Sequence, residues 1–236
     1  MRNEECGMNG VKRASSDCAI RNPQSAIRIL VNAGPTREYF DSVRFISNPS
    51  TGKQGFAIAR AAVRRGHQVV LVAAPVDLPD VTGAKMIRVT SAAQMASACK
   101  AEFEGCDAAV LTAAVCDYRP SERVPYKRAK SAEPLQITLE PTEDICASLG
   151  KVKGNRMVIG FAMDDRDGQA KAEAKLLRKN CDAIVQNGPQ NVGSDRALVR
   201  ILSRKSGWGE RIEGSKEQIA EHLISILEKL RAARAG

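Results

Sequence analysis

The segment 47–55 reads Ser-Asn-Pro-Ser-Thr-Gly-Lys-Gln-Gly and stands directly before apolar residues at helical spacing. Small hydroxyl and glycine residues at a helix start leave backbone N–H groups free at the positive end of the helix dipole, which favours phosphate. The segment is not a Walker loop, because Gln54 follows Lys53. No G-x-G-x-x-G fingerprint follows the preceding strand either. The pattern predicts an anion site, although a helix cap with a turn before it has the same composition.

Three further loops carry charged side chains after predicted strands. Asp117 follows the fourth predicted strand, where an acidic residue can hold a sugar hydroxyl or a metal-bound phosphate. A basic run lies at 123–130, and the segment 160–162 (Gly-Phe-Ala) precedes two lysines one helical turn apart, Lys175 and Lys179. Each feature alone also fits a solvated turn or face. Because strand ends converge at one sheet edge, together they predict a site for a small phosphorylated ligand.

The elements that must position these loops alternate along the chain. Continuous apolar runs predict buried strands, and 3.6-residue spacing predicts helices. The expected strands are residues 28–33, 68–74, 85–89, 107–113, 156–161 and 182–186. The expected helices are residues 53–65, 91–104 with Ser91 as N-cap, 169–179 and 215–230. This alternation predicts an α/β fold with a doubly wound, Rossmann-like, mostly parallel sheet.

Two stretches break this rhythm, because polar and apolar residues alternate in them. Residues 135–140 and 198–202 predict half-exposed antiparallel strands. We expect them to form a small antiparallel excursion from the main sheet at the interface of a homodimer, since exposed strand edges need covering. Residues 1–26 are polar and aperiodic, and we expect a disordered leader there. Residues 27–236 are then expected to form one domain.

Composition excludes several classes of protein. The chain has 236 residues and no apolar run near the ~20 residues that a membrane helix needs, so no membrane association is expected. A net charge of +9 favours anionic partners, but only 4% of the residues are aromatic, which speaks against nucleic acid. The basic residues form two local clusters, at 119–130 and 171–179, which suit a small phosphorylated ligand better than a nucleic-acid backbone. The seven cysteines show no C-x-x-C spacing, and two histidines accompany them. We therefore expect no metal cluster, and reduced thiols in a cytoplasmic protein.

Several strings keep the order and spacing found in one enzyme family. The sequence resembles the phosphopantothenoylcysteine synthetases, the second half of the bacterial bifunctional flavoprotein of coenzyme A biosynthesis. The matching strings are residues 33–38 (AGPTRE), 43–48 (VRFISN), 50–53 (STGK), 113–120 (AAVCDYRP), 160–162 (GFA) and 178–180 (RKN). The resemblance covers residues 28 to about 230. Because 26 residues are too few for a flavin-binding decarboxylase half, we expect no flavin, and a separate decarboxylase acting downstream.

The resemblance implies a ligase that joins 4′-phosphopantothenate to L-cysteine. In this family CTP activates the carboxylate as an acyl-cytidylate and releases pyrophosphate, and the amine of cysteine then displaces CMP. The resemblance further implies that Mg²⁺ enters with the nucleotide and that the protein is a homodimer.

It also implies roles for individual residues. Asn48 matches the asparagine that acts on the acyl-cytidylate, Arg44 a neighbouring functional arginine, and Lys127 the flap lysine needed to form the cytidylate. The implied nucleotide-binding positions are Asp117, Lys127, Glu143, Asp144, Ile145, Cys146, Phe161, Lys175 and Lys179. The positions expected to bind phosphopantothenate are Gly34, Asn48, Ser50, Thr51, Gly52, Ala113 and Ala114.

Two departures from the family leave alternatives open. The flap usually reads Lys-x-Lys-Lys and is here Lys-Arg-Ala-Lys at 127–130, and the turn usually reading Asn-Pro-Asp-Ile is Thr-Glu-Asp-Ile at 142–145. A non-catalytic paralogue that binds a phosphorylated ligand would tolerate both changes. The sheet alone also fits a nicotinamide-dependent oxidoreductase, against which the missing glycine fingerprint speaks. CTP is favoured over ATP because the strings follow the bacterial pattern.

Overall fold

The computed structural model describes residues 26–163 and 168–235, and an eight-stranded sheet forms its centre. The strand order is β12-β11-β10-β9-β6-β1-β4-β5. Neighbouring strands from β5 to β10 pair in parallel, and β11 and β12 extend the sheet antiparallel. The strand bounds are β1 Arg28–Ala33, β4 Gln68–Ala73, β5 Ala84–Arg88, β6 Ala108–Leu111, β9 Met157–Met163, β10 Ala183–Asn187, β11 Arg196–Ser203 and β12 Gly207–Ser215. The predicted mostly parallel, doubly wound sheet is confirmed.

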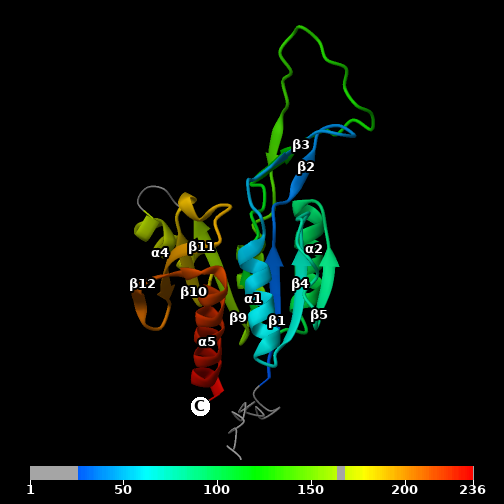
Figure 1. Cartoon of the computed structure of the whole chain (residues 1–236). Helices are drawn as coiled ribbons and strands as arrows, with labels where there is room; N and C mark the ends of the chain where they lie inside the picture. Colours follow the sequence, from blue (N-terminus) through cyan, green and yellow to red (C-terminus); the bar gives the residue numbers. More distant parts are fainter. Residues whose placement is uncertain (1–25, 164–167, 236) are drawn as a thin grey trace, which may run out of the picture.

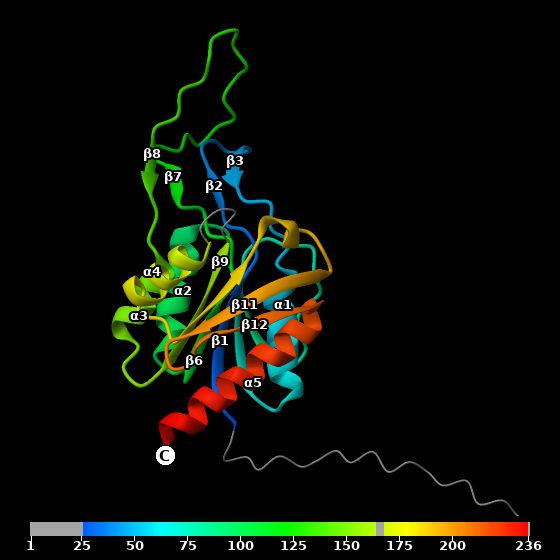
Figure 2. The same ribbon diagram turned by 90° about the vertical axis from the view of Figure 1, so that its left-hand side faces the viewer.

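Helices cover both faces of this sheet (Figures 1 and 2). One apolar core lies between the sheet and α1 with α5, and a second lies between the sheet and α2, α3 and α4. The helix bounds are α1 Lys53–Arg64, α2 Ala92–Phe103, α3 Ile145–Val152, α4 Gly168–Arg178 and α5 Lys216–Ala235, with a short 3₁₀ turn η2 at Pro189–Asn191. No helix in the described ranges is long and apolar enough to cross a membrane.

Local sequence explains why these elements begin and end where they do. The predicted N-cap Ser91 accepts a hydrogen bond from the backbone N–H of Gln94, whose side chain in turn accepts from the Ser91 N–H. This capping box satisfies two helix-terminal donors. In β1, Ile29 to Ala33 are all buried, because the strand lies centrally with a helix layer on each face. A continuous apolar run is the expected signature of such a strand.

The predicted antiparallel excursion is right for one stretch and wrong for the other. Of residues 135–140, only the last two belong to a strand, β8 Leu139–Pro141, which pairs with β7 Tyr118–Pro120 outside the main sheet. Residues 198–202 lie within β11, which is part of the main sheet because it pairs with β10. The half-exposed pattern expected from alternation holds for residues 198–202, whereas no residue of 135–140 is buried. Alternation in any case carries no information on the neighbouring strand. Residues 1–25 of the expected leader lie outside the described residues.

An arm projects from the carboxyl edge of the sheet (Figures 1 and 2). It consists of the hairpin of β2 (Arg37–Tyr39) with β3 (Phe45–Ser47), the pair of β7 with β8, and the connecting loop 121–138. We call this loop the flap. The basic run 123–130 therefore lies beyond the sheet rather than on it.

Candidate functional site: the carboxyl edge at the turn of strand order

The chain changes direction across the sheet between β1 and β6. The strands that follow β1 go one way to β4 and β5, and the later ones go the other way to β6, β9 and β10. Doubly wound sheets bind ligands in the crevice at this switch point, outside the carboxyl ends of the strands. The loops after β1 and β6 are joined there by a parallel bridge between Pro35 and Ala114 and by the Ala114 N–H, which donates to Gly34 O at 3.0 Å.

Two predicted glycines bring the loop after β1 against the start of α1. Gly34 and Gly52 have φ angles of 83° and 72°, a region that favours glycine. A Cβ on either residue would lie 2.9 Å from Val76 Cγ1, and a Cβ on Gly52 would lie 3.4 Å from the Gly34 Cα. Glycine is therefore needed at both positions for the strand loop and the helix N-terminus to touch.

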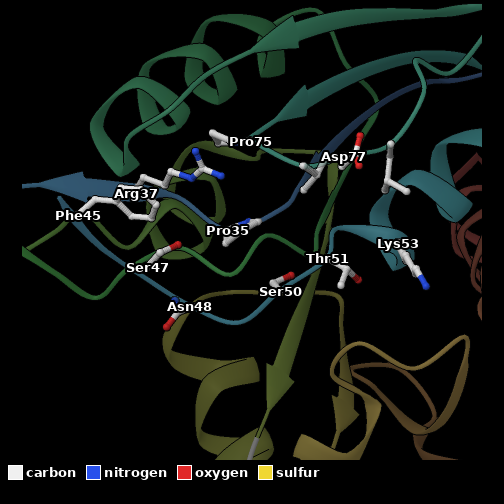
Figure 3. Close-up of a pocket in the computed structure, with 12 residues that line it drawn as sticks. Pro35, Arg37, Phe45, Ser47, Asn48, Ser50, Thr51, Lys53, Pro75 and Asp77 are labelled. Carbon is white, nitrogen blue, oxygen red and sulfur yellow. The ribbon is translucent and has the colours of Figure 1, made fainter. Parts of the chain in front are cut away.

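A cavity of about 710 Å³ opens beside these glycines (Figure 3). Its walls come from the loops after β1, β3 and β4 and from the start of α1. The residues that line it are Pro35, Arg37, Phe45, Ser47, Asn48, Ser50, Thr51, Lys53, Pro75, Val76, Asp77 and Leu78. Three residues expected to bind phosphopantothenate, Asn48, Ser50 and Thr51, thus lie on one cavity.

The sequence reasoning missed the charged residues of this cavity. Arg37 and Lys53 bring positive charge to it, and Asp77 brings negative charge. The Arg37 guanidinium lies 4.7 Å from the centre of the Phe45 ring, and Lys53 Nζ pairs with Asp195 Oδ1 at 2.5 Å. Arg37 and Lys53 both lie within strings that match the family, so the sequence did contain a signal that could have identified them. Asp77 follows β4 in a loop with no motif of its own.

Asn48 is held by the loop that follows β6. Its Nδ2 donates to the carbonyl oxygens of Ala114 and Val115, each at 3.2 Å. This loop is itself held in place by β1, because Asn32 Oδ1 accepts a hydrogen bond from the backbone N–H of Ala113 at 3.0 Å. The structure therefore brings together Asn48, Ala113 and Ala114, three positions predicted for one ligand.

The predicted nucleotide-binding turn lies on the other side of the switch point, at the start of α3. Asp144 is the N-cap of α3, accepting from the backbone N–H of Ala147 at 3.0 Å, and it also pairs with Lys179 Nζ at 3.1 Å. Glu143 pairs with Lys100 at 2.9 Å, and this hydrogen bond lowers the pKa of the Glu143 carboxyl. Asp144 and Lys179, two positions predicted to bind the nucleotide, are thus brought together.

The remaining positions predicted to bind the nucleotide are spread over the sheet edge. Cys146 lies in α3 and Lys175 in α4, on one face of the sheet, whereas Phe161 of β9 packs with the α1 layer on the opposite face. Ile145, the first residue of α3, is buried, and Asp117 is exposed, with its carbonyl accepting from the Thr142 N–H at 2.9 Å. A single ligand touching all of them would have to lie across the carboxyl ends of the strands.

Arg44 and Lys127 lie on the arm. Arg44 Nε donates to the buried carboxylate of Asp41 at 2.9 Å, and its Nη2 donates to the backbone carbonyl of Arg128. Asp41 also accepts from the Arg128 N–H at 3.3 Å. Arg44 thus ties the β2–β3 hairpin to the flap next to Lys127, whose side chain is exposed.

The Asp41 carboxylate is stabilised in its charged form. Burial by itself would raise its pKa, but three backbone N–H donors and the Arg44 charge outweigh burial and lower the pKa to about 2. Because this is below the ordinary value of about 3.9, the carboxylate stabilises the arm at pH values above that value. The stabilisation is lost as the pH falls through about 2.

Replacing Asp41 with asparagine is expected to loosen the flap at neutral pH, because an amide nitrogen would face backbone donors. Trypsin should then cut within 123–130 faster, on the order of tenfold, since hydrogen bonds to charged groups are the stronger ones. The matched control is Asp80→Asn, whose carboxylate pairs with Arg88 on the surface. Equal cleavage rates in both variants would show that Asp41 does not hold the flap.

Among the described residues, no group of three or more histidine, cysteine, aspartate or glutamate side chains is placed to hold a metal ion. The strand order and the helix layers define a doubly wound α/β protein, and the crevice at the switch point with the loop that opens α1 is its candidate ligand site. The chain belongs to the family described as the DNA/pantothenate metabolism flavoprotein C-terminal domain, whose model matches residues 25–230. The resemblance seen in the sequence strings is confirmed.

Known relatives agree with this membership. A protein of an unknown prokaryotic organism named cysteine/cysteine sulfinic acid decarboxylase is 44% identical over 208 residues, or 86% of this chain and 58% of that protein. The coenzyme A biosynthesis bifunctional protein CoaBC of Bacillus subtilis is 38% identical over 88% of this chain and 52% of its own length. A crystal structure of the C-terminal domain of a CoaBC protein matches with a TM-score of 0.76 and 34% identity, covering 89% of this chain and 98% of that one. The chain spans about half the length of the curated relatives it matches.

Proposed function

We propose that this chain is a phosphopantothenate–cysteine ligase that uses CTP and forms an acyl-cytidylate. The observation that supports this most directly is that residues predicted to bind phosphopantothenate and residues predicted to bind the nucleotide lie along the same edge of the sheet. Asn48, Ser50 and Thr51 lie on the cavity beside β1, and Asp144 with Lys179 lies at the start of α3. A substrate carboxylate in the cavity and a nucleotide across the strand ends would meet at the switch point.

In the first step, a carboxylate oxygen of 4′-phosphopantothenate attacks the α-phosphorus of CTP, and the bond to pyrophosphate breaks. The chain's contribution is positioning and positive charge, since this transfer needs charge neutralisation more than a strong base. Lys175 of α4 and Lys179, which directly follows this helix, would face the phosphates, and Lys127 would approach them from the flap. Mg²⁺ entering with the triphosphate would neutralise part of its charge.

In the second step, the amine of cysteine attacks the acyl carbon and CMP leaves with the bonding electrons. Negative charge develops on the acyl oxygen during this attack, and a fixed N–H donor lowers its free energy. Asn48 is the residue we assign to this oxygen. It stands on the cavity wall, where its Nδ2 donates to the carbonyl oxygens of Ala114 and Val115; in the proposed step one of these hydrogen bonds would hold the amide in place while the other N–H turns to the acyl oxygen.

The experiment that tests the proposal uses the purified full chain with 4′-phosphopantothenate, cysteine, Mg²⁺ and either CTP or ATP. We expect pyrophosphate release that depends on 4′-phosphopantothenate and is faster with CTP. Binding of 4′-phosphopantothenate without pyrophosphate from any nucleotide would instead identify a non-catalytic paralogue. Binding of a nicotinamide cofactor, or carbon dioxide release from cysteine, would contradict the proposal.

We further propose that two copies of the chain associate through the arm. Exposed apolar side chains gather there: Val43, Phe45, Tyr118, Tyr126, Leu135 and Leu139. A monomer rarely leaves such a set uncovered, and the arm presents them beyond the sheet edge (Figure 1). The occupant we propose is the arm of a second copy, which would also cover the edges of β7 and β8.

The expected result is a dimer in light scattering at micromolar concentration. Leu135→Glu should raise the dimer dissociation constant about tenfold or more, because it places a charge within an apolar contact. Leu177→Glu is the matched control, since Leu177 is 67% exposed on α4, away from the arm. A monomeric wild-type chain, or equal weakening by both substitutions, would rule out the arm as the interface.

A further inference from the structure

Two cysteines that are far apart in the sequence have their sulfur atoms in contact. Cys146 Sγ lies 3.3 Å from Cys181 Sγ, although the two residues are 35 positions apart. Cys146 belongs to the first turn of α3, and Cys181 lies two residues before the start of β10. Both are free thiols in this structure. This contact has no part in the ligase mechanism proposed above.

The space for the two sulfur atoms is left by a glycine of the neighbouring strand. A Cβ on Gly160 of β9 would lie 3.1 Å from Cys146 Sγ and 3.5 Å from Cys181 Sγ. The backbone that carries Cys181 is anchored, since its N–H donates to the Leu176 carbonyl at 3.0 Å. Cys181 is fully buried, whereas Cys146 is partly exposed. A small reagent would therefore reach Cys146 first.

The surroundings of the two thiols make Cys146 the reactive cysteine and Cys181 the resolving cysteine. The hydrogen bond from Cys181 lowers the pKa of Cys146, with help from the charges of Lys179 and Arg178 and against burial and Asp144. The same hydrogen bond, together with burial, raises the pKa of Cys181. By comparison, burial raises the pKa of Cys99 to about 12. Thiolates are the attacking species, so Cys146 is the nucleophile of the pair.

We propose that Cys146 and Cys181 form a reversible disulfide when the protein meets hydrogen peroxide. The Cys146 thiolate attacks one peroxide oxygen, forming an S–O bond while the O–O bond breaks and hydroxide leaves. Cys181, losing its proton, then attacks the Cys146 sulfur, so that the S–S bond forms and the S–O bond breaks. The second hydroxide takes up that proton. In sum, two thiols and one peroxide become one disulfide and two waters.

The consequence for activity rests on the proposed function. Closing the S–S distance from 3.3 Å to about 2.05 Å pulls the two side chains together, and we expect this to shift the backbone of one of the two cysteines. The first turn of α3 is the more exposed of them, and it carries Asp144 and its pair with Lys179. A displacement of roughly 1 Å beside a reacting group can cost up to about 10² in rate. We expect the oxidised protein to release pyrophosphate at least about tenfold more slowly, with recovery in dithiothreitol.

The test treats the full chain with hydrogen peroxide, alkylates the remaining thiols under denaturing conditions and identifies the peptides by mass spectrometry. The expected product is a peptide pair linking Cys146 to Cys181, absent after dithiothreitol. Cys99 should stay reduced and alkylatable. Cys181→Ser should lose the link, whereas Cys99→Ser should keep it; both residues are fully buried in the same apolar layer, and thermal melting of the reduced variants checks their folding.

The outcomes separate this proposal from the proposed function. Two free thiols after peroxide, or a link from Cys146 to a different cysteine, would overturn the disulfide. A linked protein that releases pyrophosphate as fast as the reduced one would overturn the effect on activity. A reduced protein that releases none with any nucleotide would overturn the ligase and leave the thiol result standing.

Discussion

Asn48→Asp is expected to lower product formation by on the order of 10²–10³, the usual effect of losing one oxyanion donor. A carboxylate cannot donate, and it would repel the negative acyl oxygen as cysteine attacks. Pyrophosphate release should remain measurable, because the first step does not use this donor. The measurement follows pyrophosphate and phosphopantothenoylcysteine in parallel reactions.

The structure adds a second reason for a large effect at this position. Asn48 Nδ2 lies 3.2 Å from the carbonyl oxygens of Ala114 and Val115, so an aspartate oxygen there would face two acceptors. Asn48→Ala is the matched control, because it removes the donor without adding this repulsion. A thermal melting comparison shows whether the loop has moved. Product formation by Asn48→Asp at the wild-type rate would withdraw the role assigned to Asn48.

Lys127→Gln is expected to block cytidylate formation, with pyrophosphate release falling on the order of 10²–10³. Its charge is needed mainly while negative charge develops on the leaving pyrophosphate, so the rate should suffer more than nucleotide affinity. The measurement follows pyrophosphate release without cysteine at several salt concentrations.

Arg128→Gln is the matched control for this experiment. The contacts of Arg128 with Asp41 and Arg44 use its backbone N–H and carbonyl, so both substitutions leave the attachment of the flap intact. Arg128→Gln should mainly weaken nucleotide binding at low ionic strength, because the half-buried Arg128 charge acts partly through solvent and salt screens it in the wild type as well. Normal release by Lys127→Gln would transfer the role to Lys130. Wild-type pyrophosphate release and nucleotide binding in both variants would mean that the basic side chains of the flap are solvated and take no part in the reaction.

The sheet and its helix layers were predictable because they depend on local patterns. The runs at β1, β4 and β9 are apolar on both faces, and such a run is stable only between two covering layers. Ser91 was recognised as an N-cap because the capping hydrogen bonds join residues three apart. The segment 47–55 was recognised because hydroxyl and glycine residues stood directly before a helical pattern. In each case the residues that interact are close in the sequence.

Other parts of the candidate site were decided by tertiary structure. Asp77 lies on the cavity because β4 is the neighbour of β1 in the sheet. Neither the residue types nor their spacing in the sequence predicts which strands are neighbours. The attachment of the flap to Asp41 spans 87 positions, and the contact of Cys146 with Cys181 spans 35. Strand β11 illustrates the reason. The alternation of polar and apolar residues indicates that one face of the strand is exposed, because it reflects the burial of each residue separately. Which strand lies beside it depends on pairing between distant segments, and that is set by the packing of the whole chain.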